Sequence, residues 1–209
     1  MNVIQTPNQE NVIKRILWLY GLRSLLSMIS LLVGYYLLPE GILRGASPLA
    51  TVVAEQPNFW LHFGETFIFN LALVVVFGVG LNLIMYKEGF PWGYAIPIVT
   101  GVFGGLMVGT NSFMDDLSRY SVLEGLVRGY SIGELEMLGY IFIIASTARV
   151  SIYRDDTPWY SLRTKFIKVK DFREITLSRQ EWIALISGIF LLLISAYNET
   201  VMWFTEVLG

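Results

Sequence analysis

Five long apolar stretches separated by polar loops set the pattern of this chain. They cover residues 16–38, 64–86, 92–114, 132–153 and 180–203. Each has about 22–24 residues, or about 33–36 Å of helix, which is enough to cross a hydrocarbon core of ~30 Å. Because backbone groups in lipid must be hydrogen-bonded within their own segment, the pattern predicts five transmembrane helices.

Local signals mark three helix starts. Residues 6–9 (Thr-Pro-Asn-Gln) join a capping hydroxyl to a Pro in the first turn. Ser178 is followed three residues later by Glu181, and Ser131 is followed in the same way by Glu134. Each of these pairs predicts a capping box, at the head of the last and of the fourth span.

Two loops are apolar enough to lie at a membrane surface. Residues 115–130 place Leu117, Tyr120, Leu123, Val127 and Tyr130 at helical spacing, which predicts an amphipathic interfacial or re-entrant helix. The loop of residues 40–63 ends in Phe-Trp and predicts an aromatic anchor.

The basic residues are sorted between alternate loops. Of the 15 Lys and Arg, only Arg44, Arg119 and Arg128 fall outside the N-terminal region, Lys87 and residues 149–179. The positive-inside rule then places the N-terminus in the cytoplasm and the C-terminus outside. With 54% hydrophobic and 15% charged residues, residues 1–209 are expected to form a single transmembrane domain of a multi-pass cell-membrane protein.

The residue inventory excludes several kinds of site. Cysteine is absent, so no disulfide, thiolate metal site or cysteine nucleophile is available. The single histidine, His62, excludes a site with several histidine ligands. We therefore expect no metal and no cofactor, and no motif for nucleic-acid binding is visible.

The third span carries Gly101, Gly105 and Gly109 on one face. Small residues four positions apart let a second helix approach closely, so the pattern predicts a tight helix crossing. Packing within the chain is favoured over packing against a second copy, although the sequence leaves both open.

Three polar residues in the predicted spans are candidates for function, namely Asn70, Glu134 and Arg149. Arg128 or Arg149 is the expected ion partner of Glu134, and no charge is expected at the bilayer centre. The basic inner segment is a candidate surface for anionic lipid or for a protein partner, through Arg163, Lys165, Lys168, Lys170 and Arg173.

Residues 129–133 (Gly-Tyr-Ser-Ile-Gly) match the G-x-S-x-G string of serine hydrolases. Ser131 and His62 fall on the same predicted side, so an intramembrane Ser–His dyad is one hypothesis. The string normally requires a strained strand-to-helix turn, which an all-helical chain lacks, so catalysis is the less favoured interpretation.

Two stretches resemble the stage II sporulation protein M family of integral membrane proteins. Residues 67–70 (Phe-Ile-Phe-Asn) lead through a glycine-bearing span to the turn at 87–93 (Lys-Glu-Gly-Phe-Pro-Trp-Gly). Residues 130–135 (Tyr-Ser-Ile-Gly-Glu-Leu) look like the family motif H-G-x-x-E-L, with Tyr130 and Ser131 in place of its His and Gly. The resemblance carries over Asn70, Glu134 and the flanking glycines. It implies a non-enzymatic membrane component that acts with other proteins.

The expected function is therefore a non-enzymatic membrane scaffold or subunit, working with a protein partner or as a homo-oligomer. The main alternative is a small oligomeric permease or channel, and an intramembrane serine hydrolase comes third.

Overall fold

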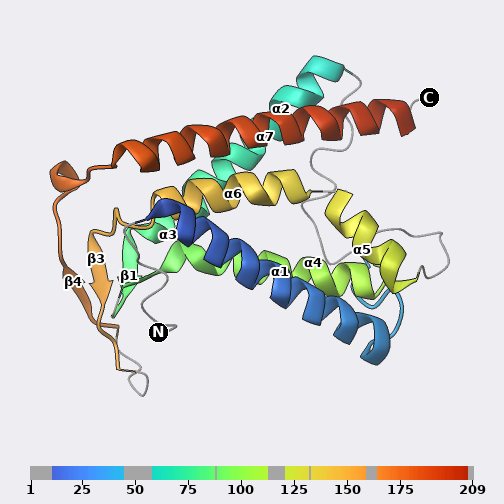
Figure 1. Ribbon diagram of the computed structural model, residues 1–209, viewed down its shortest axis with the longest axis horizontal. Coiled ribbons are helices and arrows are strands. Elements are labelled where there is room, and N and C mark those ends of the chain that lie inside the picture. Colours follow the sequence, from blue (N-terminus) through green and yellow to red (C-terminus); the bar gives the residue numbers. More distant parts are fainter. Residues whose placement is uncertain are drawn as a thin grey trace.

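A computed structural model of the protein describes residues 11–44, 58–87, 89–112, 121–131, 133–158 and 164–206. The described chain is mainly helical, with a small sheet at one end of the helix bundle (Figure 1). Its helical elements are α1 (Val12–Leu37), α2 (Phe59–Leu73), the π-helix η3 (Val74–Val79), α3 (Gly80–Asn82), the 3-10 helix η4 (Trp92–Tyr94), α4 (Ala95–Gly109), α5 (Val122–Ser131), α6 (Glu134–Ser146), the 3-10 helix η5 (Phe172–Glu174) and α7 (Arg179–Glu206).

Four helical segments within the described residues are long and apolar enough to cross a membrane. They are Val12–Leu37, Phe59–Asn82, Trp92–Gly109 and Arg179–Thr205. The fifth predicted span corresponds to α6, which has 13 residues and is thus about 20 Å long. A helix of this length is shorter than the ~20 residues that a simple span requires, so a fifth crossing is not confirmed.

Of the predicted helix starts, the capping box at Ser178 is confirmed and the one at Ser131 is wrong. Ser178 and Glu181 form the predicted capping box, with the Ser178 N–H donating to Glu181 Oε2 at 2.8 Å and the Glu181 N–H donating to Ser178 Oγ at 3.3 Å. The box predicted at Ser131 is wrong, because Ser131 ends α5 and α6 begins after Gly133 without a side-chain cap. The predicted start at residues 6–9 lies outside the described residues, and Asn11 caps α1.

A four-stranded sheet was not predicted. Its strands are β1 (Ile84–Tyr86), β2 (Phe90–Pro91), β3 (Tyr153–Asp155) and β4 (Phe166–Lys168), in the order β2-β1-β3-β4. The strands β1 and β3 are parallel, and the outer pairs are antiparallel. The ends of the second and fourth predicted spans therefore leave the helical bundle and pair as strands.

The glycine ladder of α4 packs against α1. A Cβ on Gly101 would lie 2.7 Å from Arg23 Cγ, and Cβ atoms on Gly105 and Gly109 would collide with the carbonyl oxygens of Ser27 and Leu31. Such contacts leave no room for side chains, so α1 and α4 cross with their backbones close together. The ladder is thus occupied within the chain.

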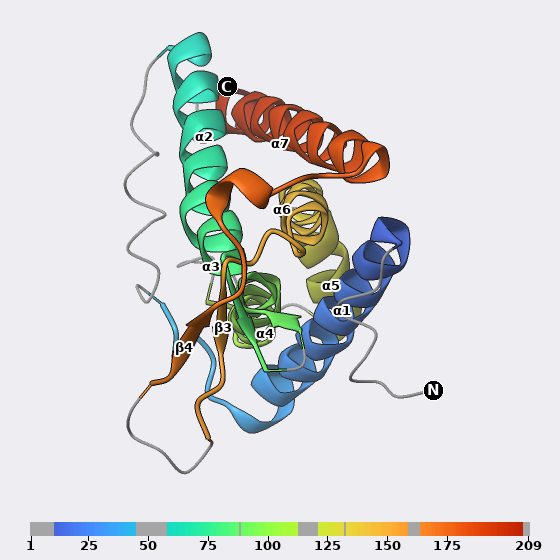
Figure 2. The same cartoon turned by 90° about the vertical axis from the view of Figure 1, so that its left-hand side faces the viewer.

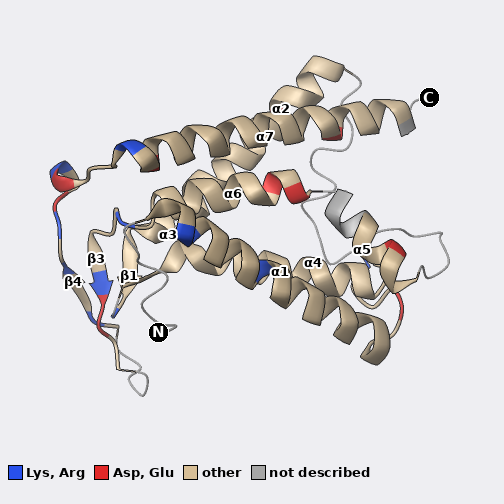
Figure 3. Ribbon diagram, in the orientation of Figure 1, with Lys and Arg blue, Asp and Glu red and all other residues tan. Residues whose placement is uncertain are grey.

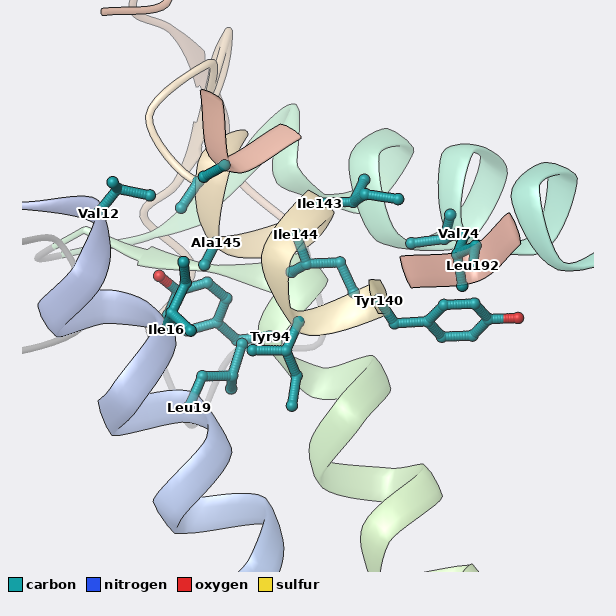
Figure 4. Packing of buried hydrophobic residues seen from close by; sticks show 13 residues of the cluster. Val12, Ile16, Leu19, Val74, Tyr94, Tyr140, Ile143, Ile144, Ala145 and Leu192 are labelled. Carbon is teal, nitrogen blue, oxygen red and sulfur yellow. The ribbon is translucent and has the colours of Figure 1, made fainter. Parts of the chain in front are cut away.

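The short helix α6 lies in the middle of the bundle. Viewed along the bundle axis, α7, α2, α4 and α1 surround it (Figure 2). In the hydrophobic core, Ile143 and Ile144 of α6 pack with side chains of α1 and η3 and with Tyr94 of η4 (Figure 4). Gly139 makes the crossing with α7 close, because a Cβ there would lie 3.0 Å from the Gly188 carbonyl oxygen.

Candidate functional site: a polar cluster at the head of α6

A stripe of buried positions runs along α2 and its continuation. The buried residues recur every four positions, and the three nearest the start of α2 are polar. His62 is 3% exposed and shares a 3.1 Å hydrogen bond between its Nδ1 and Thr200 Oγ1 of α7. Farther along, Asn70 Oδ1 accepts a 3.4 Å hydrogen bond from the Tyr140 hydroxyl of α6. The stripe is therefore bonded to both neighbouring helices.

An ion pair links α1 to the first residue of α6. Arg23 Nη1 donates to Glu134 Oε2 at 2.8 Å, and the two side chains are 11% and 17% exposed. The described ion partner of Glu134 thus comes from α1 and is not Arg149, whereas the side chain of Arg128 lies outside the described residues. Arg23 lies midway along the 26 residues of α1.

Carboxylates outnumber cations around this pair. Glu136 lies two residues after the first residue of α6, beside the Tyr140 hydroxyl and within electrostatic range of Glu199 on α7 and of Arg23. Among the described residues, this cluster thus holds three carboxyl groups and one guanidinium. The excess of negative charge makes the cluster suited to attracting a cation.

The cluster lies where the chain breaks between two helices. Gly133 separates α5 from α6 with φ 87°, a left-handed conformation that glycine adopts without strain. The first turn of α6 contains Glu134 and Glu136, whose negative charge suits the positive end of the helix dipole. One carboxylate oxygen, Glu134 Oε1, is buried and has no hydrogen-bond partner within the part of the chain that the structure describes.

Two further buried polar groups were missed by sequence reasoning. Arg15 is fully buried and its Nη2 donates to Glu181 Oε1 at 2.5 Å, which joins the starts of α1 and α7. Asn82 is fully buried and donates to the Ile144 carbonyl at 2.8 Å and to Thr147 Oγ1 at 2.9 Å. The signal for Arg15 was available, because it falls on the apolar face of α1 with Val12, Ile16 and Leu19.

The basic candidates lie at the sheet-bearing end, where most Lys and Arg gather (Figure 3). Arg149 follows α6 and is exposed, and it lies apart from Glu134 at the opposite end of that helix. The four described members of the basic surface are exposed along β4 and η5, and they are Lys165, Lys168, Lys170 and Arg173. Arg163 lies outside the described residues.

The described residues show no Ser–His dyad that would support the hydrolase hypothesis. His62 is bonded to Thr200 and stacks on Trp203, with ring centroids 5.9 Å apart and planes at 11°. The side chain of Ser131 is outside the described set. Within the described ranges, no group of three or more His, Asp or Glu is placed to hold a metal ion.

Comparisons with protein-family models, with characterised proteins and with solved structures find no match to this chain. The resemblance to the stage II sporulation protein M family therefore stays a prediction that rests on residues 67–70, 87–93 and 130–135.

Proposed function

We propose that the protein is a multi-pass protein of the cell membrane that acts as a non-enzymatic scaffold or subunit. In this proposal the sheet-bearing end lies in the cytoplasm and α5 lies on the outer side. The concentration of Lys and Arg at the sheet-bearing end supports this orientation. The resemblance to the stage II sporulation protein M family, through Asn70 and Glu134, supports a role beside other proteins.

The observation that carries the scaffold role is the free face of α5. Leu123 and Val127 are four residues apart on this helix and are 71% and 63% exposed. The opposite side of α5 contacts α4 and α6, where Gly125 is buried. Ser121 and Glu124 form a capping box that fixes the start of the helix. The helix thus presents an apolar ridge that suits the hydrophobic side of a partner helix.

The buried polar groups fit the same proposal. Arg15 is paired with Glu181, Arg23 with Glu134, and Asn82 with the end of α6. Each of these bonds joins two helices of this chain. They serve to hold the bundle together, and the surfaces outside it are left for partners.

A photo-crosslinking amino acid at Leu123 or Val127 tests the scaffold role in living membranes. We expect a discrete crosslinked protein, either a partner or a second copy of this chain. The same amino acid at Ile186, an exposed residue of α7, is the control for random contacts between membrane proteins. If Leu123 and Val127 give no more crosslinked protein than Ile186, the proposal is wrong.

A small permease or channel is the second candidate, and the polar cluster at the head of α6 favours it. Interrupted helices with ionisable groups at the break are a frequent design of ion and substrate sites in transporters. We expect cation or proton flux in proteoliposomes that falls when Glu134 becomes Gln. Glu174→Gln, at the exposed 3-10 helix η5, is the matched control. Equal flux in both variants, or none in the native protein, rules against this candidate.

A further inference from the structure

A small polar pocket opens at the sheet-bearing end, away from the cluster at the head of α6. Its volume is about 160 Å³, which is well above the ~10–15 Å³ that one water molecule requires. Strand β1, the turn that follows it, the segment after α6 and the segment after β4 contribute the lining. The lining residues are Met85, Gly89, Ala148, Arg149, Ser151 and Lys170.

Among the described residues, the lining of the pocket carries two positive charges and no carboxylate. The Lys170 ammonium donates to the Arg149 carbonyl at 3.3 Å, which holds the two residues together. Within the described ranges neither side chain belongs to a salt bridge. The arrangement leaves a guanidinium and the remaining ammonium hydrogens available to a ligand.

Two neighbouring basic residues, unlike Arg149 and Lys170, form salt bridges with acidic side chains. Arg154 pairs with Asp156 at 2.8 Å, and Lys168 pairs with Asp171. The hydrogen bond from Lys168 to Asp171 raises the pKa of that lysine. Arg154 and Lys168 thus have acidic partners, whereas neither cation of the pocket belongs to a salt bridge among the described residues.

We propose that this pocket binds a phosphate-bearing anion, with Arg149 and Lys170 as its ligands. The planar guanidinium can donate two parallel hydrogen bonds to phosphate oxygens, and the ammonium adds a point charge. A phospholipid headgroup and a soluble phosphate share this chemistry. A headgroup is the natural source if this end lies at the cytoplasmic leaflet, where basic pockets beside transmembrane helices bind anionic lipids. The site itself does not depend on the scaffold role.

Binding is measured on the delipidated full-length protein in neutral detergent, through its tryptophan fluorescence. The probes are short-chain phosphatidylglycerol, short-chain phosphatidylcholine and inorganic phosphate. We expect saturable binding of phosphatidylglycerol, of inorganic phosphate or of both. Saturation by phosphatidylglycerol alone assigns the site to a lipid, and equal saturation by phosphate assigns it to a soluble anion. No saturable binding of either overturns the proposal.

Charge-removing variants separate this pocket from general attraction to a basic surface. Arg149→Gln and Lys170→Gln should each weaken binding about tenfold or more, as expected for the loss of a charged hydrogen bond. The matched control removes two exposed charges of the same segment outside the lining, through Lys165→Gln with Lys168→Gln. An equal loss in the control pair shows non-specific attraction and overturns the site. Lys170 is exposed, so its variant decides the matter if Arg149→Gln does not fold.

Discussion

Replacing Glu134 by Met removes one member of the ion pair inside the bundle and keeps a side chain of similar length. Arg23 then remains 2.8 Å from a side chain that carries no charge, in a place where it is only 11% exposed. An arginine does not lose its proton under ordinary conditions, so its charge loses its hydrogen-bonded partner and keeps only the electrostatic influence of Glu136. The reciprocal variant, Arg23→Met, leaves a carboxyl group that can take up a proton instead.

This difference sets the expected magnitudes. At 2.8 Å and an effective dielectric constant of ~20, the attraction between the two charges is about 6 kcal/mol, and much of it is cancelled by the loss of hydration. Removing one partner of a buried pair typically costs about 3–5 kcal/mol. We expect Glu134→Met to lower the free energy of unfolding by about this amount and Arg23→Met to lower it less. The double variant should lose less than the sum of the two single losses, because it removes both members of the ion pair together.

The assay is reversible unfolding in mixed micelles with increasing SDS, followed by tryptophan fluorescence, on all four members of the cycle. The control is the partly exposed pair of Arg154 and Asp156, for which Asp156→Asn should change the free energy of unfolding by less than about 1 kcal/mol. A double variant whose loss equals the sum of the two single losses, within about 0.5 kcal/mol, would refute the coupling.

Three further substitutions test packing and capping by the same unfolding assay. Gly105→Ala should lower the free energy of unfolding by about 1–3 kcal/mol, because its Cβ meets the backbone of α1. Its control, Gly104→Ala, has open space around it and should be neutral or stabilising, so equal effects of the two variants would contradict the close crossing of α1 and α4. Asn82→Ala should lower the free energy of unfolding by about 1–3 kcal/mol, because the groups that Asn82 bonds at the end of α6 lose their partner. Asn198→Ala, at an exposed position, should change it little, and similar losses in both variants would show that burial is not the cause. Ser178→Ala should cost about 1 kcal/mol through loss of the α7 cap, and an unchanged unfolding midpoint would exclude that role.

The sequence predicts those features that repeat along a helix or stand next to each other in the chain. The apolar stretches locate α1, α2, α4 and α7 because a membrane-crossing helix needs a long continuous run. The spacing of four in Gly101, Gly105 and Gly109 predicts a close crossing, and the pair of Ser178 and Glu181 predicts a cap. Each signal is local, so a single segment is sufficient to show it.

The remaining features depend on contacts between distant segments. The partner of Glu134 is 111 residues away, and nothing near Arg23 in the sequence indicates the pairing. The strands have two or three residues each, which is too few for an alternation of apolar and polar residues to be recognised. The sequence at residues 131–134 matches the capping-box pattern, because Ser131 and Glu134 have the correct spacing. The backbone turns at the glycine between them, and this displaces the start of α6.

Single cysteines in this cysteine-free chain report the orientation of the helix bundle in the membrane. Thr164→Cys probes the sheet-bearing end, Ser121→Cys probes the start of α5, and Thr205→Cys probes the end of α7; all three positions are exposed. A membrane-impermeant maleimide is added to intact cells, and a second sample is labelled after the membrane is opened. We expect labelling of Ser121→Cys and Thr205→Cys in intact cells and of Thr164→Cys only after opening. Labelling of Ser121→Cys and Thr164→Cys from the same side would contradict a crossing by α6, and labelling of Thr164→Cys in intact cells would contradict the orientation.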